Sequence, residues 1–162
     1  MPSLMDVAIT FILAALPVSE VRGAIPYGLL RGLDPILVLL ISFAGNVLPI
    51  PPLLALLKVA EGAVARLASR EGALSIVARA YISYASRARE RVRPYVGRYG
   101  ALGLALFTAT PLPFTGAWTS ALAAHVLGMD ARLAAASIAA GVALAGIIVE
   151  ALMGALMAAW PL

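Results

Sequence analysis

Apolar residues fall along this chain in runs of two lengths, and breaks rich in proline and glycine separate the runs. Residues 7–16 form a short run and residues 24–30 another. Neither can cross a bilayer alone, because a spanning helix needs about 20 residues. The next run, residues 36–57, is long enough, although Pro49 and two further prolines should kink or divide its helix. The pattern predicts two short helices followed by a divided spanning helix.

The same order of runs returns in the second half of the chain. Residues 101–110 and 117–127 are short runs on either side of a proline-containing break, and the run from residue 133 to about residue 160 can span. Once a three-residue insertion is allowed, the glycines of the two halves align as Gly23 with Gly116, Gly32 with Gly128, and Gly45 with Gly141. This match indicates an internal duplication.

Each half therefore has two helices too short to span and one that is long enough. A helix of about 10–12 residues rises roughly 15–18 Å, about half of the ~30 Å hydrocarbon core. Two such helices suit a re-entrant hairpin, which enters and leaves the bilayer on one side, so the second half enters from the opposite face. We expect an all-α integral membrane protein built as an inverted repeat, as in many transporters. The alternative is a plain bundle of four to six full helices with kinks.

Composition favours a membrane protein over other classes. Of 162 residues, 62% are hydrophobic and 12% are charged, against roughly 25% charged in an ordinary soluble domain. So few charges cannot cover a water-soluble globule, and disordered chains have the opposite composition. With no cysteine and one histidine, the sequence excludes disulfides, cysteine-based zinc sites and histidine-rich metal sites. We expect no metal ion and no cofactor.

The basic residues are concentrated in the middle of the chain. Nine of the twelve lie between Lys58 and Arg98, and the formal net charge is +4. Membrane proteins retain Lys and Arg on the cytoplasmic side, so this segment indicates topology rather than a nucleic-acid partner. We expect one membrane domain in the plasma membrane, with a first repeat (residues 1–57), a basic cytoplasmic linker of one or two amphipathic helices (residues 58–99), a second repeat (residues 100–162) and both termini outside.

The candidate chemistry lies in the two breaks. Glu20 and Arg22 stand one residue apart between two apolar runs, so both lie deep in the bilayer if the hairpin forms. Ionisable groups at that depth are costly and usually functional. A carboxylate in a low dielectric binds a proton more readily, and a guanidinium offers a fork of donors that fits phosphate or carboxylate. The alternative is a structural pair that neutralises itself and fixes the hairpin.

Helix ends would add to this site. Half-helices beginning near Gly23 and Gly116 would aim their positive N-terminal ends at its centre, with Ser19 and Thr115 as caps. An anionic head group is the natural ligand of such a site. The remaining candidates to line it are Asn46, Pro111, Pro113 and Trp118. Glu150, late in the last spanning run, is expected at the outer interface.

Three blocks of sequence contain most of these residues. The first is PVSEVRGAIPYG at residues 17–28, the second is GN at residues 45–46 followed by PIP at residues 49–51, and the third is TPLPFTGAWT at residues 110–119. In this order they resemble the signatures of the putative small multidrug export protein family. The resemblance covers nearly the whole chain, and it departs from the expected pattern at Phe114, where we expect a glycine.

That family is thought to be a distant relative of the DedA/VTT membrane proteins, whose inverted re-entrant hairpins resemble the architecture described above. The resemblance implies a transporter or flippase that moves polyprenyl phosphate or phospholipid, driven by protons or sodium. Glu20 would exchange a proton while Arg22 and the helix ends hold the anionic head group. No nucleotide loop, paired-carboxylate hydrolase site or serine triad is present, so we do not expect an enzyme.

Two other functions stay open. One is a proton-coupled exporter of cationic amphiphiles, with Glu20 as the acceptor. The other is a non-transporting membrane scaffold whose basic linker docks partners. In each case membrane lipids are the expected surroundings. Because two crossings leave little protein to surround two hairpins, we also expect a homodimer.

Overall fold

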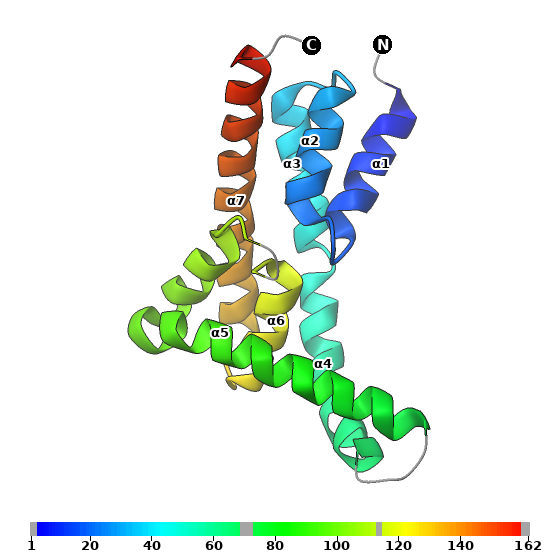
Figure 1. Ribbon diagram of the computed structural model, residues 1–162, viewed down its shortest axis with the longest axis vertical. Coiled ribbons are helices and arrows are strands. Elements are labelled where there is room, and N and C mark those ends of the chain that lie inside the picture. The colour runs from blue at the N-terminus through cyan, green and yellow to red at the C-terminus, as the bar shows by residue number, and fades with distance from the viewer. Residues whose placement is uncertain (1–2, 69–72, 113–114, 160–162) are drawn as a thin grey trace.

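The computed structural model describes residues 3–68, 73–112 and 115–159. Helices account for nearly all of these residues and no strand occurs in these ranges, which confirms the all-α prediction. The helices are α1 (Leu4–Ala15), α2 (Glu20–Leu30), α3 (Pro35–Val47), α4 (Ile50–Ala68), α5 (Ala73–Ala109), α6 (Ala117–Val126) and α7 (Ala131–Ala159) (Figure 1).

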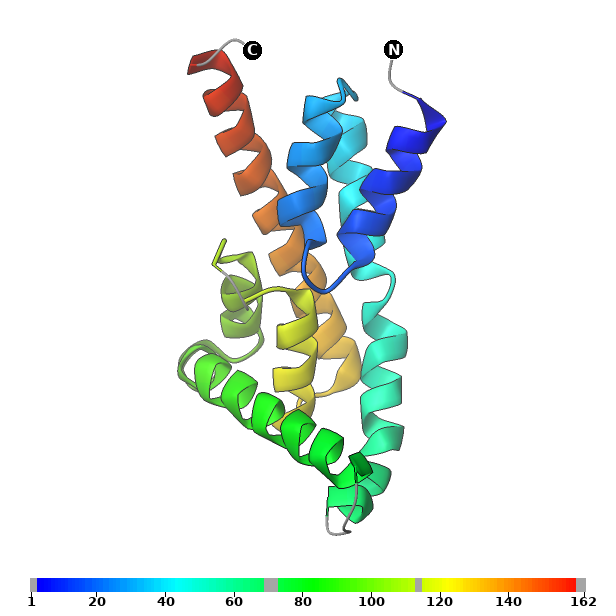
Figure 2. The ribbon, with the colours of Figure 1, turned by 45° about the vertical axis from the view of Figure 1, so that its right-hand side comes forward.

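The helices form an elongated body (Figures 1 and 2). Helix α1 runs from one end to the middle and α2 returns, after which α3 and α4 together run the whole length. At the far end α5 crosses the body and turns toward the middle, α6 runs back, and α7 returns over the whole length. The first turn of α1 and the last turn of α7 therefore lie at one end, and the end of α4 lies at the other.

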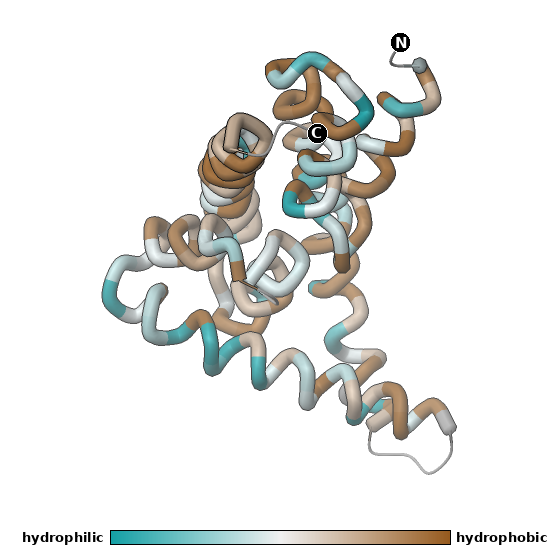
Figure 3. The backbone as a smooth tube through the Cα atoms, turned by 45° about the horizontal axis from the view of Figure 1, so that its top comes forward, coloured by the Kyte–Doolittle hydropathy of each residue, from teal (hydrophilic) through white to brown (hydrophobic). Residues whose placement is uncertain are grey.

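Within the described ranges, two stretches are long and apolar enough to cross a membrane, namely Pro35–Ala68, formed by α3 and α4, and α7. Much of their apolar surface is exposed, with exposed fractions of 69% for Ile36, 81% for Val59 and 60% for Leu152. In Figure 3, α7 is mostly apolar, whereas polar and apolar residues alternate along α5. Apolar surface exposed over such a length indicates a membrane protein.

Prolines divide the first spanning stretch, as the sequence predicts. Near the end of α3, the N–H of Leu48 donates to the carbonyl oxygen of Ala44 at 3.0 Å. Near the start of α4, the N–H of Leu53 donates to the carbonyl oxygen of Pro49 at 3.0 Å. Between them, Pro49, Pro51 and Pro52 have no N–H with which to continue the hydrogen-bond ladder.

The first break is shorter than predicted. Helix α2 begins at Glu20 rather than near Gly23, and it continues through Pro26. The reason is packing, because Val21 and Ile25 are 2% and 0% exposed in the core, and this burial outweighs one missing backbone hydrogen bond. The charged pair therefore lies in the first turn of α2 rather than in an irregular loop.

Helix α5 turns sharply at Gly100, whose φ of 57° and ψ of −132° suit glycine. The part before the turn carries six of the twelve basic residues, and the part after it is apolar and runs toward the middle of the body. The turn lies where the sequence places the end of the basic linker. Residues 69–72 of that linker lie outside the described ranges.

Two glycines that align in the sequence also make equivalent helix contacts. A Cβ added at Gly45 of α3 would lie 2.5 Å from the carbonyl oxygen of Phe11 in α1, and one added at Gly141 of α7 would lie 2.5 Å from that of Ala105 in α5. In both places the side chain three residues further along the short helix contacts the glycine as well. Each short helix therefore packs on its spanning helix in the same way.

Candidate functional site

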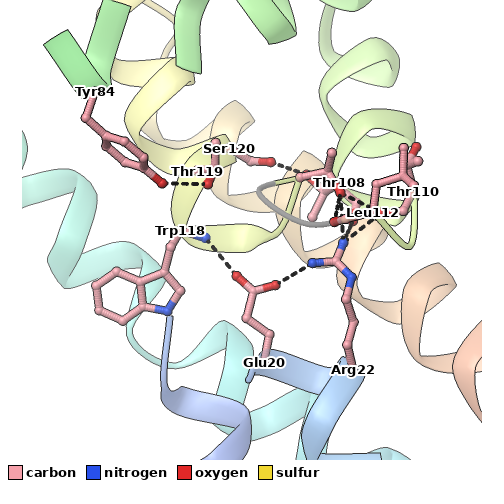
Figure 4. A network of polar contacts seen from close by, with 10 residues as sticks. Glu20, Arg22, Tyr84, Thr108, Thr110, Leu112, Trp118, Thr119 and Ser120 are labelled. Carbon is pink, nitrogen blue, oxygen red and sulfur yellow. Dashed lines mark hydrogen bonds and ion pairs between the residues drawn. The ribbon is translucent and has the colours of Figure 1, made fainter. Parts of the chain in front are cut away.

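The turn between α1 and α2 meets the ends of α5 and α6 near the middle of the body (Figure 4). Glu20 and Arg22 project from the first turn of α2 toward these ends. Arg22 Nη1 donates to Glu20 Oε2 at 3.0 Å, and the exposed fractions of the two side chains are 22% and 6%. The two residues thus form a largely buried ion pair.

The Glu20 carboxylate lies at the N-terminal end of α6. Its Oε1 accepts a hydrogen bond from the backbone N–H of Trp118 at 3.4 Å. Gly116 precedes α6, and a Cβ added there would clash with the Glu20 carboxylate. Glycine is therefore needed for this close approach, and the carboxylate occupies the positive end of the helix dipole.

Arg22 lies at a C-terminal helix end, that of α5. Its Nη2 donates to the carbonyl oxygens of Thr110 at 2.7 Å and Thr108 at 3.2 Å, and to Thr115 Oγ1 at 3.2 Å. These carbonyls stand at the C-terminal end of α5, where a cation is favourable. Together the ion pair satisfies the negative end of α5 and the positive end of α6.

The backbone of Glu20 is unusual. Its φ of 51° is the only positive φ among the non-glycine residues that the structure describes. A left-handed conformation costs a residue with a side chain roughly 1–2 kcal/mol, and such strain often concentrates at functional sites. Here it accompanies a charged side chain directed at a helix end.

A cavity of about 330 Å³ borders the ion pair. Its lining includes Glu20, Arg22, Tyr84, Gly116, Trp118 and Thr119, with three further residues of the two turns. Two donors of these residues, Arg22 Nε and Trp118 Nε1, are buried and lack a hydrogen-bond partner within the described ranges. Buried donors normally have acceptors, so the site has unused capacity to bind an acceptor group.

A second cavity, of about 220 Å³, adjoins the first and shares Pro17, Tyr84 and Trp118 with it. Tyr84 belongs to the basic part of α5, and its hydroxyl lies 3.1 Å from Thr119 Oγ1 of α6. A tyrosine of the linker therefore closes one side of the site.

The structure brings together five of the predicted site residues, which are Glu20, Arg22, Thr115, Gly116 and Trp118. The predicted capping hydrogen bonds do not form. Ser19 precedes α2 but makes no capping hydrogen bond, and Gly116 rather than Thr115 precedes α6. Thr115 Oγ1 instead donates to the carbonyls of Thr110 and Leu112, because its side chain closes the preceding turn.

The other predicted residues that the structure describes do not line the cavity. Gly23 follows the ion pair in α2 beside Ser19, and Pro111 is exposed after α5. Asn46 is fully buried in α3, and neither of its amide atoms has a partner in the described part of the chain. Pro113, like Phe114, lies outside the described residues.

Four residues of the site were not predicted, namely Tyr84, Thr108, Thr110 and Thr119. Thr110 and Thr119 belong to the third sequence block and Thr108 immediately precedes it, so proximity to the block was an available signal. No local signal marks Tyr84, because it stands among the arginines of the linker. In the ranges that the structure describes, no group of three or more His, Asp or Glu side chains could hold a metal ion.

Comparison with protein families matches residues 20–148 to the family described as "Putative small multi-drug export protein". Comparisons with curated proteins and with solved structures found no match. The matched range includes the ion pair, both aligned glycines and the α5–α6 turn, and it covers most of the chain. The chain therefore belongs to the putative small multi-drug export protein family.

Proposed function

We propose that the protein transports an amphiphile with an anionic phosphate head group, such as polyprenyl phosphate or a phospholipid, across the plasma membrane. The observation that carries this proposal is a pair of donors, Arg22 Nε and Trp118 Nε1, that have no partner among the described residues and lie beside a cavity at the junction of the two helix turns. An oxyanion can accept from such donors, and a guanidinium fork suits phosphate.

Glu20 supplies a means of coupling transport to protons. Its carboxylate accepts hydrogen bonds from the N-terminal end of α6 and from Arg22 Nη1. An anionic head group would use the same donors. Two anions close together in a low dielectric repel each other strongly. Binding of the head group is therefore favoured when Glu20 is protonated, so one proton and one anion enter the site together. Sodium is the alternative coupling ion.

We propose further that the chain is an inverted repeat of two re-entrant hairpins, with residues 58–99 in the cytoplasm and both termini outside. The equivalent contacts at Gly45 and Gly141 support the repeat. The approach of the two hairpins from opposite ends of the body supports their re-entry (Figure 2). Irregular backbone at bilayer depth needs surrounding protein or a cavity, and both occur here.

This architecture agrees with the distant relationship to DedA/VTT proteins, which we include in the proposal. Transport then proceeds by rocking one repeat against the other around the central pair, without covalent chemistry, so the protein is not an enzyme. A homodimer would cover part of the apolar surface that α7 leaves exposed.

Export of cationic amphiphiles is the second candidate, and the family description favours it. In that function Glu20 alone would accept the cation. Because Arg22 already neutralises Glu20 in the folded protein, the cation would have to displace an arginine. The two candidates therefore differ in their need for Arg22.

The test is transport by the purified protein in liposomes, with fluorescent phospholipid and short-chain polyprenyl phosphate as substrates. We expect Arg22→Ala to abolish transport and Trp118→Phe, which keeps the ring but removes the donor, to weaken it. Glu20→Gln should remove the dependence on a proton gradient. Arg31→Ala, at an ion pair with Asp6 near the end of the body, and Glu90→Gln, on exposed α5, are matched controls.

Lipid-phosphate transport that survives both Arg22→Ala and Glu20→Gln would refute this assignment. Efflux of cationic dyes that is independent of Arg22 would favour the second candidate. If neither activity occurs, and if loss of the arginines between residues 87 and 93 abolishes the cellular function, the protein is instead a scaffold.

A further inference from the structure

The cavity that borders the ion pair is the first of three that follow one another along α6. The second cavity, of about 220 Å³, shares Tyr84 and Trp118 with the first (Figure 4). A third cavity, of about 460 Å³, shares Tyr81 with the second, and its lining includes His125 in the last turn of α6. Because neighbouring cavities share lining residues, they form a row that runs from the first turn of α6 to its last.

The second cavity is the smallest of the three and joins the other two. Helices α4, α5 and α6 all contribute to its lining, with Leu53, Leu57, Tyr81, Tyr84 and Leu122. Its volume exceeds that of several water molecules, each of which takes about 30 Å³ in the liquid. The two tyrosines carry hydroxyl groups that can hydrogen-bond to water. This part of the row can therefore hold water, although its wall is largely apolar.

The third cavity lies among charged side chains at the end of the body that α5 crosses. Its lining includes Glu61 of α4 and Arg89 of α5, and His125 Nε2 lies 3.9 Å from Glu61 Oε2. The Glu61 side chain is 74% exposed, and Arg89 is exposed as well. Lys58 and Asp130 line a further cavity that shares Glu61 and His125 with the third. Charged groups retain their hydration, so this end of the row faces the aqueous phase.

In the opposite direction from the ion pair, the protein is closely packed. Val21, Ala24 and Ile25 follow Glu20 in α2 with exposed fractions of 2%, 0% and 0%. The groove of about 770 Å³ between α7 and the helices α2 and α3 shares no lining residue with the three cavities. The row of cavities therefore joins the ion pair to the end of the body where the basic linker lies.

We infer that the three cavities form one aqueous passage, by which water, protons and small polar solutes reach Glu20 and Arg22 from the membrane face on which the linker lies. Ionisable side chains inside membrane proteins commonly mark such pathways. The inference does not depend on which amphiphile is transported. If Glu20 exchanges protons as proposed, this passage decides from which face it does so in the conformation described.

Thiol labelling tests the passage, because the chain has no native cysteine. Single cysteines replace Leu122, in the second cavity, and Thr119, in the first. A small, membrane-impermeant methanethiosulfonate is applied to right-side-out and to inside-out membrane vesicles. Both thiols should react from the face that labels Ser86→Cys, since Ser86 is exposed and lines the third cavity.

Ala123→Cys is the matched control. Ala123 is adjacent to Leu122 in α6, is 0% exposed and lines none of the three cavities. A thiol there reacts only when the helix opens locally, so its labelling should be more than about tenfold slower than that of Leu122→Cys.

Two further comparisons test the width of the passage. A maleimide carrying a bulky polyethylene glycol should label Ser86→Cys but neither Leu122→Cys nor Thr119→Cys, because the second cavity is only about 220 Å³. Leu53→Trp adds volume to the wall of that cavity, so it should slow labelling of Thr119→Cys to the rate of Ala123→Cys. Unchanged labelling of Ser86→Cys in the same background would show that the fold is intact.

Several results would overturn the inference. These are labelling of Leu122→Cys or Thr119→Cys no faster than that of Ala123→Cys, labelling only from the opposite face, and equal labelling by the small and the bulky reagent. Reaction at Leu122→Cys alone would show that the passage ends before the ion pair, which also contradicts it. Thiol labelling needs no transported substrate, so a failure of lipid transport and a failure of the passage are distinguishable.

Discussion

Replacing Gly116 with alanine should push the Glu20 carboxylate away from α6. A Cβ at this position would clash with both carboxylate oxygens of Glu20. The backbone of Gly116 has φ −80° and ψ −173°, an extended conformation that alanine adopts without strain. The substitution therefore acts on the contact between the two hairpins and not on local backbone geometry.

The expected loss in the free energy of unfolding follows from the interactions that Glu20 would lose in Gly116→Ala. They are the 3.4 Å hydrogen bond from Trp118 N–H and part of the 3.0 Å ion pair with Arg22. A hydrogen bond to a charged group contributes about 1.5–3 kcal/mol. The Trp118 bond is long, and Arg22 is 22% exposed, so solvent screens the pair. We expect a loss of about 1–2 kcal/mol in the free energy of unfolding.

Thermal denaturation in detergent, followed by fluorescence-detected size-exclusion chromatography, measures this loss. Gly62→Ala, where a Cβ meets nothing within 4 Å, is the control. The decisive comparison is a double-mutant cycle with Glu20→Ala, which removes the clashing carboxylate. In that background Gly116→Ala should cost almost nothing, and an equal cost in both backgrounds would refute the reasoning.

Further predictions concern packing, topology and the linker. Gly45→Ala and Gly141→Ala should each destabilise by about 1–3 kcal/mol, because the new methyl group meets a backbone carbonyl at 2.5 Å; thermal stability close to that of the wild type in either variant would contradict the packing. The chain has no native cysteine, so single cysteines at Leu4 and Ser86 can be labelled cleanly, and they should react from opposite faces of the membrane. Labelling from one face would exclude the inverted repeat. Tyr84→Phe should lower stability by about 0.5–1 kcal/mol through loss of its hydrogen bond to Thr119, and an unchanged melting temperature would show that this contact is immaterial.

The sequence predicted those parts of the fold that follow from local rules. The lengths of the apolar runs identified the two stretches that can span, and Pro49 with its neighbours divided the first of them where the structure divides it. The first break is shorter than predicted, because the core packing of Val21 belongs to a first turn of α2 that begins at Glu20.

For the site, the sequence singled out Glu20 and Arg22 because charge is rare between apolar runs, and it expected helix N-termini beside them. It did not predict that the carboxylate of Glu20 itself occupies the N-terminal end of α6. The Ser19 hydroxyl makes no capping hydrogen bond, and the Thr115 hydroxyl closes the preceding turn instead of capping α6. Tyr84 was missed because it comes from a different part of the chain.

The sequence by itself thus determined which segments are helical, where they break and which two charges stand between apolar runs. These properties depend on residues within one or two turns of each other, such as a proline that lacks an N–H. Only the tertiary structure decided that Glu20 meets Trp118 and that Arg22 meets Thr110, although each pair is far apart in the chain. It also left Glu150 Oε2 without a hydrogen-bond partner among the described residues, beside an apolar groove. Contacts of this kind depend on how whole helices pack, which no local pattern specifies.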